Sequence, residues 1–491
     1  MADQQRTFNE ELDLTKDPVQ LDILNTSVAE VLPLSDDYSG NIQFDIRNTR
    51  DLHYIDLSKV ELEVEFALQY QDAANNNRWT NINGDEDHAG LVNNIIHSAF
   101  SNVEVKLNNT VVTDSEKTYG YLAYLAKLTG HDAVHLEDTQ GRLIGWGKDE
   151  AGDMDTTTVK FPTKFGTGTV FSKAISTSSS ETLHTFVKSR DYRGNGLGIR
   201  RNCFFYKDSN NAWQYKNAVL RDKFMCVPFN QKKFLPYRVN MFITLERTNN
   251  DFVTMQDTSS AGTDGKEYHL KIVRAKLYVP FVELNASKFR ALEVQKMQVD
   301  RKIPLTRMIV LTRPIPSRTV HPIITNLFQG KPFPKRMLVG LVANIAEAGD
   351  KTKNPYNFGN WNIRHFQVFK NGVTFPTYPF KPDFAKENYA ELYAALFDTL
   401  GSRWENLGLS VNYYDYGNGC TLIPFDLTGD RKGAEDDVDH IPEYGEITFD
   451  IMFKSGSNEL PQVVTSLIVA AEYEDTMIID GYGNVRCTWK G

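Results

Sequence analysis

The sequence predicts an all-β protein made of two copies of one sandwich domain. Three observations support this fold class. Apolar and polar residues alternate with a period of two in short stretches along the whole chain, which indicates half-buried antiparallel strands. Convincing helical patterns are few, and the best two occupy matching places in the two halves of the chain. Each of these two helices also follows a strand, a tight turn and a second strand.

The alternating stretches define the predicted strands. The clearest one places apolar side chains on one face and glutamates on the other, with Val60, Leu62, Val64, Phe66 and Leu68 opposed to Glu61, Glu63 and Glu65. The same period returns from Val239 to Leu245, from Ala275 to Val279 and from Ile447 to Phe453. One face of each strand is therefore expected in a core and the other in water.

The repeated unit of the first half begins with the sequence NVEVKLNNTVV at residues 102–112. Its centre, Asn108-Asn109, predicts a turn because asparagine tolerates positive φ. A helix is expected over residues 118–128, with Tyr121, Leu125 and Leu128 on one face and Gly130 as its C-terminal cap.

The second half repeats this order. Residues 365–375 read HFQVFKNGVTF, in which Asn371-Gly372 is a strong signal for a two-residue hairpin turn. A helix is expected over residues 388–400, and Gly401 follows it. Two copies of one all-β domain explain both units.

Domain boundaries follow from the strand pattern and its interruptions. We expect an extended N-terminal arm at residues 1–36, a first sandwich at 37–285, a short linker helix at 286–302 and a second sandwich at 303–491. The first sandwich carries long polar insertions, at residues 71–90, 138–181 and 192–216, which are expected to be surface loops.

Composition excludes several classes of protein. With a formal net charge of -9, the chain has no global basic field, so specific nucleic-acid binding is not expected. The four cysteines, Cys203, Cys226, Cys420 and Cys487, form no CxxC pair, which argues against a zinc knuckle or a disulfide scaffold. The N-terminus lacks the pattern of a signal peptide, and no apolar run reaches the roughly 20 residues that span a bilayer. A soluble protein made inside the cell is expected, and docking onto a membrane surface is left open.

Two motifs resemble ligand sites only superficially. His131 and His135 have the i, i+4 spacing of zinc ligands and flank Asp132, but the glutamate of the zinc-protease motif is missing. Gly194, Gly196 and Gly198 resemble a phosphate-binding loop, but no helix pattern follows them, so a flexible loop is expected.

The remaining candidates are weaker still. One candidate is an acidic run that consists of Glu435, Asp436, Asp437 and Asp439 with His440. It lacks the spacing of a calcium-binding loop, and a solvated loop is the simpler interpretation. Asn25, Asn108 and Asn285 begin glycosylation sequons, which are attributed to chance in a chain without a signal peptide. No nucleophile or acid/base motif is recognised, so we predict no catalytic, cofactor-binding or metal site.

Several stretches together resemble one family of viral proteins. In the first half these are YIDLSKVELEVEF at Tyr54, LVNNIIHSAFSNVEVKLNNTVV at Leu91, TYGYLAYLAKL at Thr118 and WGKDEAGDMD at Trp146. In the second half they are IPLTRMIVLTRPIPS at Ile303, NLFQGKPFPKRMLVGLV at Asn326, KNPYNFGNWNI at Lys353, ENYAELYAALF at Glu387 and GCTLIPFDLTGD at Gly419. The chain resembles, over nearly its whole length, the double jelly-roll major capsid proteins of the Polinton/Maverick, adintovirus and virophage-like group, which are related to adenovirus hexon.

The resemblance implies an architecture and an assembly rather than a catalytic site. It predicts two tandem eight-stranded jelly rolls with a few short helices and long loop insertions. It also implies a homotrimer that tiles the icosahedral shell of a double-stranded DNA virus or virus-like element, in contact with neighbouring capsomers, penton and minor capsid proteins. The N-terminal arm is then expected to join capsomers, and deletion of residues 2–34 is expected to leave both sandwiches folded.

Two alternatives stay open at the level of sequence. Jelly rolls also serve as carbohydrate-binding proteins and glycan-active enzymes, which would require a groove with paired carboxylates or stacked tryptophans. A single-jelly-roll penton or minor capsid protein is the other alternative, but this chain has two sandwich repeats.

Overall fold

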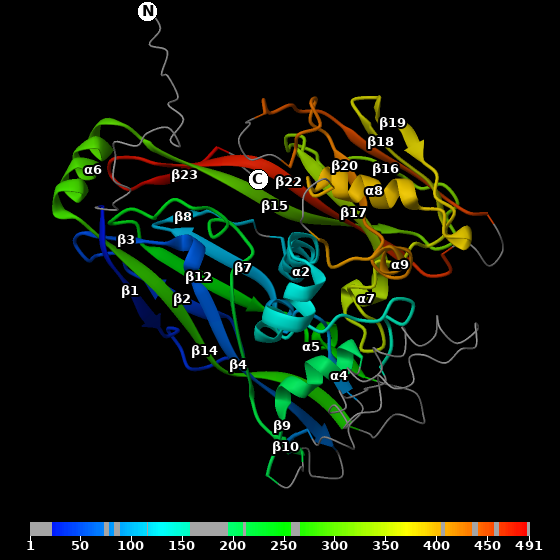
Figure 1. The fold of residues 1–491 in the computed structure, drawn as a ribbon, viewed down its shortest axis with the longest axis horizontal. Coiled ribbons are helices and arrows are strands. Elements are labelled where there is room, and N and C mark those ends of the chain that lie inside the picture. The colour runs from blue at the N-terminus through cyan, green and yellow to red at the C-terminus, as the bar shows by residue number, and fades with distance from the viewer. Residues whose placement is uncertain are drawn as a thin grey trace, which may run out of the picture.

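The computed structural model describes residues 22–72, 78–82, 89–114, 116–157, 195–209, 213–256, 266–403, 408–434, 440–455 and 461–488. Figure 1 shows two β-sandwiches side by side, with the first half of the chain at the lower left and the second half at the upper right. Helix α6 lies at one end of the molecule, where the first sandwich passes into the second.

The first sandwich consists of two antiparallel sheets. One sheet has the order β1 (Ile23–Val31), β14 (Lys266–Leu284), β4 (Glu61–Asp72) and β11 (Ala218–Lys223), with β3 (His53–Ile55) and β5 (Trp79–Asn81) at its margins. The other has the order β2 (Ile42–Ile46), β12 (Met241–Arg247), β7 (Phe100–Leu107) and β8 (Thr110–Val111). If these eight principal strands are numbered along the chain, the sheets have the orders 1-8-3-6 and 2-7-4-5.

The second sandwich repeats this topology strand for strand. One sheet has the order β15 (Arg301–Ile315), β22 (Thr465–Ile479), β17 (Arg336–Ala343) and β20 (Ile423–Asp426), with β23 (Val485–Cys487) beside β22. The other has the order β16 (Ile323–Ile324), β21 (Ile447–Phe453), β18 (Ile363–Lys370) and β19 (Val373–Phe380). Numbered along the chain, the sheets are again 1-8-3-6 and 2-7-4-5. Two eight-stranded jelly rolls in tandem are therefore confirmed.

The strand patterns predicted from the sequence lie in these sheets with the expected faces. In β4, Leu62, Val64, Phe66 and Leu68 are buried, and the intervening glutamates are more exposed. The two predicted hairpins have the backbone that their turn residues allow, since Asn108 has a φ of 50° and Asn371 and Gly372 have φ of 49° and 78°. The local turn chemistry thus sets the register of both hairpins.

The predicted helices are present, but Gly130 is the last residue of the first one and His131, in an extended conformation, caps it. Helix α2 (Tyr119–Gly130) follows the first hairpin, α8 (Ala390–Thr399) follows the second, and α6 (Ala286–Gln298) links the rolls. The Asn285 side chain caps α6 by accepting a hydrogen bond from the Ser287 amide. Shorter elements in the connections are α1 (Ile95–Ser98), α4 (Gly196–Arg201), α5 (Asn250–Val253), α7 (Asn344–Ala348), α9 (Tyr413–Gly417), β6 (Ala89–Leu91), β9 (Phe205–Lys207), β10 (Trp213–Tyr215) and β13 (Thr254–Gln256).

The predicted N-terminal arm requires a correction. Within residues 1–36, the segment Ile23–Val31 is not an extended arm but the edge strand β1, which pairs with β14 from Ile23 opposite Leu284 to Val31 opposite Leu277. Its alternation is weak in the sequence because an edge strand is covered on only one side, and Leu24 and Val28 are exposed. Deletion of residues 2–34 would therefore remove a strand of the first roll.

Candidate functional site

The two rolls share one hydrophobic core, and α2 lies where they meet (Figure 1). The Tyr124 ring of this helix stacks on Tyr356 of the second roll, with centroids 4.1 Å apart and ring planes 7° apart. Trp146 stacks on Tyr124 at 5.4 Å, and the Tyr356 hydroxyl lies 2.6 Å from the Ser98 hydroxyl. Burial raises the pKa of the Tyr356 hydroxyl well above its usual range. This buried aromatic stack joins the two rolls into a single structural unit.

A buried arginine also joins the rolls, through residues 112–114, which precede α2 in the chain. Arg307 of β15 lies 2.6 Å from the Asp475 carboxylate of β22. It also donates to the Asp114 carboxylate at 3.1 Å and to the Val112 carbonyl at 3.0 Å, both in the first roll. Because the Arg307 and Asp475 side chains are almost fully buried, this group is an internal connection and not a surface ion pair.

The glycine-rich stretch forms a second buried connection instead of the expected flexible loop. Residues 196–201 form α4, and the Asn195 side chain caps it by accepting from the Gly198 amide at 2.9 Å. Arg200 of this helix points inward, donating to the Leu91 carbonyl at 2.6 Å and to the Asp149 carboxylate at 2.7 Å. Asp149 in turn accepts from the Asn354 side chain of the second roll at 2.9 Å.

Glycine is required here for close packing. A Cβ on Gly196 would lie 2.4 Å from the Lys148 carbonyl oxygen, closer than any real contact. The two cations that follow these glycines, Arg200 and Arg201, are both fully buried. Gly194 lies outside the described residues. The motif therefore has a packing role, which the sequence pattern did not reveal because α4 is short and held by tertiary contacts.

We expect Gly196→Ala to lower the free energy of unfolding by about 1–3 kcal/mol, the usual cost of overpacking. The measurement is the urea midpoint of the variant against wild type. Gly130→Ala is the matched control, because nothing lies within 4 Å of the added methyl group and alanine favours the helix by up to about 1 kcal/mol. Equal stability of Gly196→Ala and wild type would contradict the packing role.

The two histidines after α2 lie together. The His131 and His135 rings are 4.4 Å apart, and the Asp132 carboxylate accepts the His135 amide at 2.6 Å. Burial, Lys127 and His135 lower the pKa of His131 to about 4. Across the described ranges, no three His, Cys, Asp or Glu side chains are grouped to hold a metal ion. All four cysteines are free thiols.

Two of the three sequon asparagines have clear internal roles. The Asn108 side chain donates to the Gly483 carbonyl of the second roll at 2.6 Å and accepts from the Asn240 amide of the first roll at 2.9 Å, so it links the two rolls. Asn285 caps α6, and Asn25 lies on β1. Of the acidic run, residues 435–439 lie outside the described part of the chain, whereas His440 is described.

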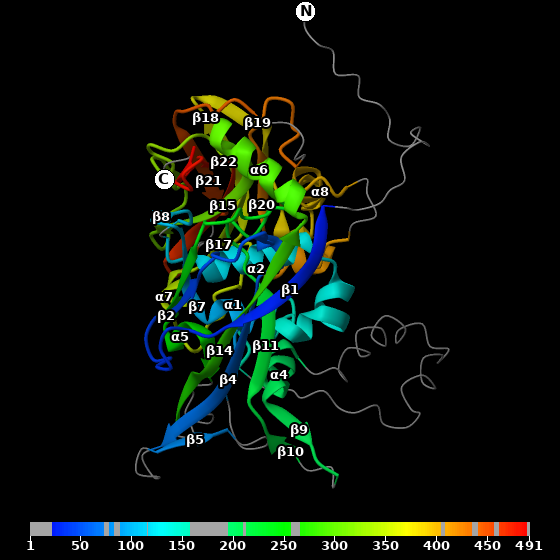
Figure 2. The same ribbon diagram turned by 90° about the vertical axis from the view of Figure 1, so that its left-hand side faces the viewer.

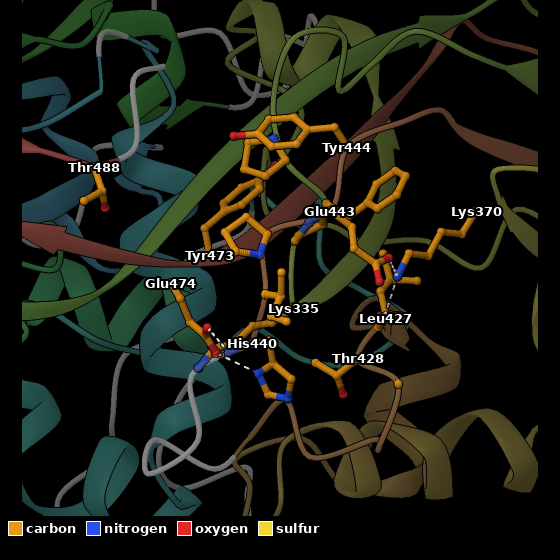
Figure 3. A pocket seen from close by; sticks show the side chains of 16 residues that line it. Lys335, Lys370, Leu427, Thr428, His440, Glu443, Tyr444, Tyr473, Glu474 and Thr488 are labelled. Atoms are coloured by element: carbon orange, nitrogen blue, oxygen red, sulfur yellow. Dashed lines mark hydrogen bonds and ion pairs between the residues drawn. The ribbon is translucent and has the colours of Figure 1, made fainter.

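His440 lines a pocket of about 310 Å³ on the second roll (Figure 3). Its Nδ1 lies 2.9 Å from the Glu474 carboxylate of β22, and its Nε2 lies 3.2 Å from Asp430. The other carboxylate of the pocket, Glu443, is paired with Lys370 at 2.7 Å. Each pocket carboxylate is thus held by a basic side chain. The described lining includes Phe333, Tyr444 and Tyr473 but no tryptophan, so the stacked tryptophans expected of a sugar site are not found there.

The contact between His440 and Glu474 is expected to make a pH-dependent contribution to stability. The hydrogen bond with Glu474 raises the pKa of His440 above its usual value of about 6.5. This contribution is complete below the unfolded pKa and is lost as the pH rises through the folded pKa. We expect His440→Gln to lower the melting temperature at pH 5.5, by the equivalent of less than about 1 kcal/mol, and to have no effect at pH 9.

The matched control for this prediction is His53→Gln, because among the described residues His53 bonds to a backbone carbonyl and to no carboxylate. A loss of stability in His440→Gln that is independent of pH would show that the side chain acts by packing alone.

Comparisons with known proteins agree with this topology. No protein-family model matches the sequence, and no curated protein matches it significantly. The chain has the double jelly-roll fold that is found in solved structures of viral major capsid proteins. A chain of the Sputnik virophage structure aligns over 98% of this chain and 92% of its own length, with a TM-score of 0.60 and 11% identity.

Two further structures give the same result. The mavirus major capsid protein aligns over 97% of this chain and 92% of its own, with a TM-score of 0.54 and 11% identity. VP54 of PBCV-1 aligns over 97% of this chain and all of its own, with a TM-score of 0.51 and 12% identity. At these identities the likeness establishes the fold.

No described helix is long and apolar enough to cross a membrane.

Proposed function

We propose that this chain is a structural major capsid protein of a double-stranded DNA virus or virus-like element of the Polinton, adintovirus and virophage-like group. The observation that carries the proposal is the repetition of one jelly-roll topology twice in a single core, aligned over almost the whole length of virophage and mavirus structures. In this role the protein is part of the virion, it has no enzymatic activity, and it requires no cofactor.

The proposed assembly unit is a homotrimer. Three copies of a two-roll subunit place six similar rolls around a threefold axis, which gives a pseudo-hexagonal capsomer. The single chain leaves apolar side chains uncovered along the edge strand β1 and the segment after it, where Leu24, Val28, Leu32 and Leu34 are each about 60% exposed. An apolar row of this kind, beside a strand edge that pairs with no other described strand, favours burial against another subunit. Contacts with neighbouring capsomers, penton and minor capsid proteins complete the proposal.

Light scattering of the purified protein is expected to give about three times 55.9 kDa, independent of concentration in the micromolar range. The physical reason is that obligate interfaces of about 2,000 Å² or more do not dissociate on dilution. Electron microscopy of the same sample should show hexagonal particles or closed shells. A stable monomer at micromolar concentration would contradict the proposal.

A further inference from the structure

The end of the molecule at α6 is basic although the whole chain is acidic. Three segments meet there: the loop before β3, the loop between β11 and β12, and α6 itself (Figures 1 and 2). The Arg238 amide donates to the Asn48 carbonyl at 3.1 Å, joining the two loops. Tyr237 contacts Phe289 of α6, with ring centroids 5.7 Å apart, and Lys296 donates to the Tyr237 carbonyl at 3.3 Å.

This surface carries exposed cations that are not paired in a salt bridge. We call it the basic end surface and define it by Arg50, Lys232, Lys233, Arg238, Arg290 and Lys302, all exposed. None of the six forms an ion pair with another described residue. A hydrogen bond with Tyr237 raises the pKa of Arg238, and the acids Glu293 and Asp51 act on this pKa only through their charge. The acids of α6 and its end are already paired, Glu293 with Lys296 at 3.6 Å and Asp300 with Arg486 at 3.0 Å. Asp51 is the remaining exposed acid on these segments, so an excess of positive charge faces outward.

The same end also exposes apolar side chains. Val294, Met297 and Val299, on α6 and just after it, are 61%, 69% and 61% exposed. A ligand for this surface therefore needs acidic groups interleaved with apolar ones.

The chain itself contains such a segment, and the segment joins the fold at this surface. Residues 1–21 carry a side-chain charge of −3, from Asp3, Glu10, Glu11, Asp13 and Asp17 against Arg6 and Lys16, interleaved with Phe8, Leu12, Leu14, Val19 and Leu21. The next residue, Asp22, is already bound at the start of α6. Its carboxylate lies 3.1 Å from the Lys288 ammonium, and its carbonyl accepts from the Asn285 amide at 2.9 Å.

We infer that residues 1–21 bind to the basic end surface of their own chain. The tether at Asp22 holds the segment beside the surface at an effective concentration in the millimolar range, which favours it over a free anionic partner. An extended segment of this length reaches up to about 70 Å, enough to cover the surface. The bound segment offsets about half of the positive charge of the six cations and covers the apolar side chains of α6. This inference does not depend on the proposed capsid function.

The first test uses limited trypsin digestion of the full-length chain, followed by mass spectrometry for cleavage after Arg6 and Lys16. The triple variant Lys232→Glu/Lys233→Glu/Arg290→Glu removes half of the cations and is expected to accelerate cleavage at both sites at least tenfold. The control variant Lys271→Glu/Arg364→Glu/Lys381→Glu makes the same change of charge at exposed positions elsewhere, and should be cleaved like wild type. Circular dichroism at a temperature below the melting transition confirms that each variant is folded.

The second test measures binding of a labelled synthetic peptide of residues 1–21 by fluorescence anisotropy. The chain lacking residues 2–21, which keeps every described residue, should bind the peptide at least tenfold more tightly than the full-length chain, whose own segment occupies the surface. Equal binding to both chains would overturn the inference, and so would equal cleavage of the two triple variants. If a 20-base-pair DNA duplex or phosphatidylserine vesicles bind the full-length chain as tightly as the truncated one, the surface is open to external anions and the inference is wrong.

Discussion

Arg307→Met is expected to lower the free energy of unfolding by about 3–5 kcal/mol, the usual cost of breaking a buried ion pair from one side. Methionine fills a similar volume but leaves the Asp475 carboxylate without the guanidinium that lies 2.6 Å from it. The Asp114 carboxylate and the Val112 carbonyl lose the same donor, so the contact between the rolls is weakened as well. Urea denaturation at one fixed protein concentration measures the effect, because assembly makes apparent stability depend on concentration.

Arg313→Met is the matched control, since Arg313 lies on the same strand β15 but is exposed. Its effect should stay within about 0.5 kcal/mol. Arg307→Lys keeps the charge but loses the planar fork of donors, so an intermediate loss is expected. Equal stability of Arg307→Met and Arg313→Met would show that the buried group contributes nothing to joining the rolls.

The sequence predicts those parts of the fold that depend on local chemistry. Asn371-Gly372 specifies its turn because both residues adopt positive φ without strain, and the strand around Val64 specifies its inward face by alternation alone. The linker helix is likewise indicated by its capping residue, Asn285. Repetition of these local signals in the two halves was sufficient to predict two tandem jelly rolls.

Features that depend on long-range contacts were not predictable in the same way. Arg200 and Arg307 look like ordinary surface cations in the sequence, and only their partners from distant segments make their burial possible. Helix α4 has no helical period because it is short and its first residue, Gly196, packs against the Lys148 backbone. The edge strand β1 resembles an arm because pairing with β14, about 250 positions away, is what makes it a strand.

The basic end surface was hidden for a related reason. A net charge of -9 describes the whole chain, whereas the cations of Lys232, Arg238 and Arg290 come together only when the loop between β11 and β12 packs against α6. Net charge argues against a global positive field and says little about one end of a folded molecule.

Two truncations are expected to distinguish the role of the N-terminal segment from that of the first strand. The longer one should have the second largest effect on stability, after Arg307→Met. Removal of residues 2–21 is expected to leave the melting temperature within about 2 °C of wild type, because every strand of the first roll is kept and a tenfold binding effect is worth only about 1.4 kcal/mol. Removal of residues 2–34 deletes β1, which packs Ala29 and Val31 against the main core and Ile23 against the small buried cluster of Tyr54, Val282 and Leu284. Burial of one valine or isoleucine side chain contributes about 1.5–3 kcal/mol, so a loss of at least about 3 kcal/mol is expected.

The longer truncation also bares the edge of β14, and an unpaired strand edge promotes association between chains. We therefore expect this variant to aggregate on heating or to be recovered mainly as insoluble protein, whereas the shorter one stays soluble and keeps the solution mass of wild type. Differential scanning calorimetry and light scattering of the two proteins, prepared in parallel, measure both effects. If the chain lacking residues 2–34 melted like wild type, β1 would be dispensable and residues 1–36 would behave as an arm after all. If the chain lacking residues 2–21 lost its cooperative transition, the first roll would need residues before Asp22, and the boundary between segment and strand would have to be moved toward the N-terminus.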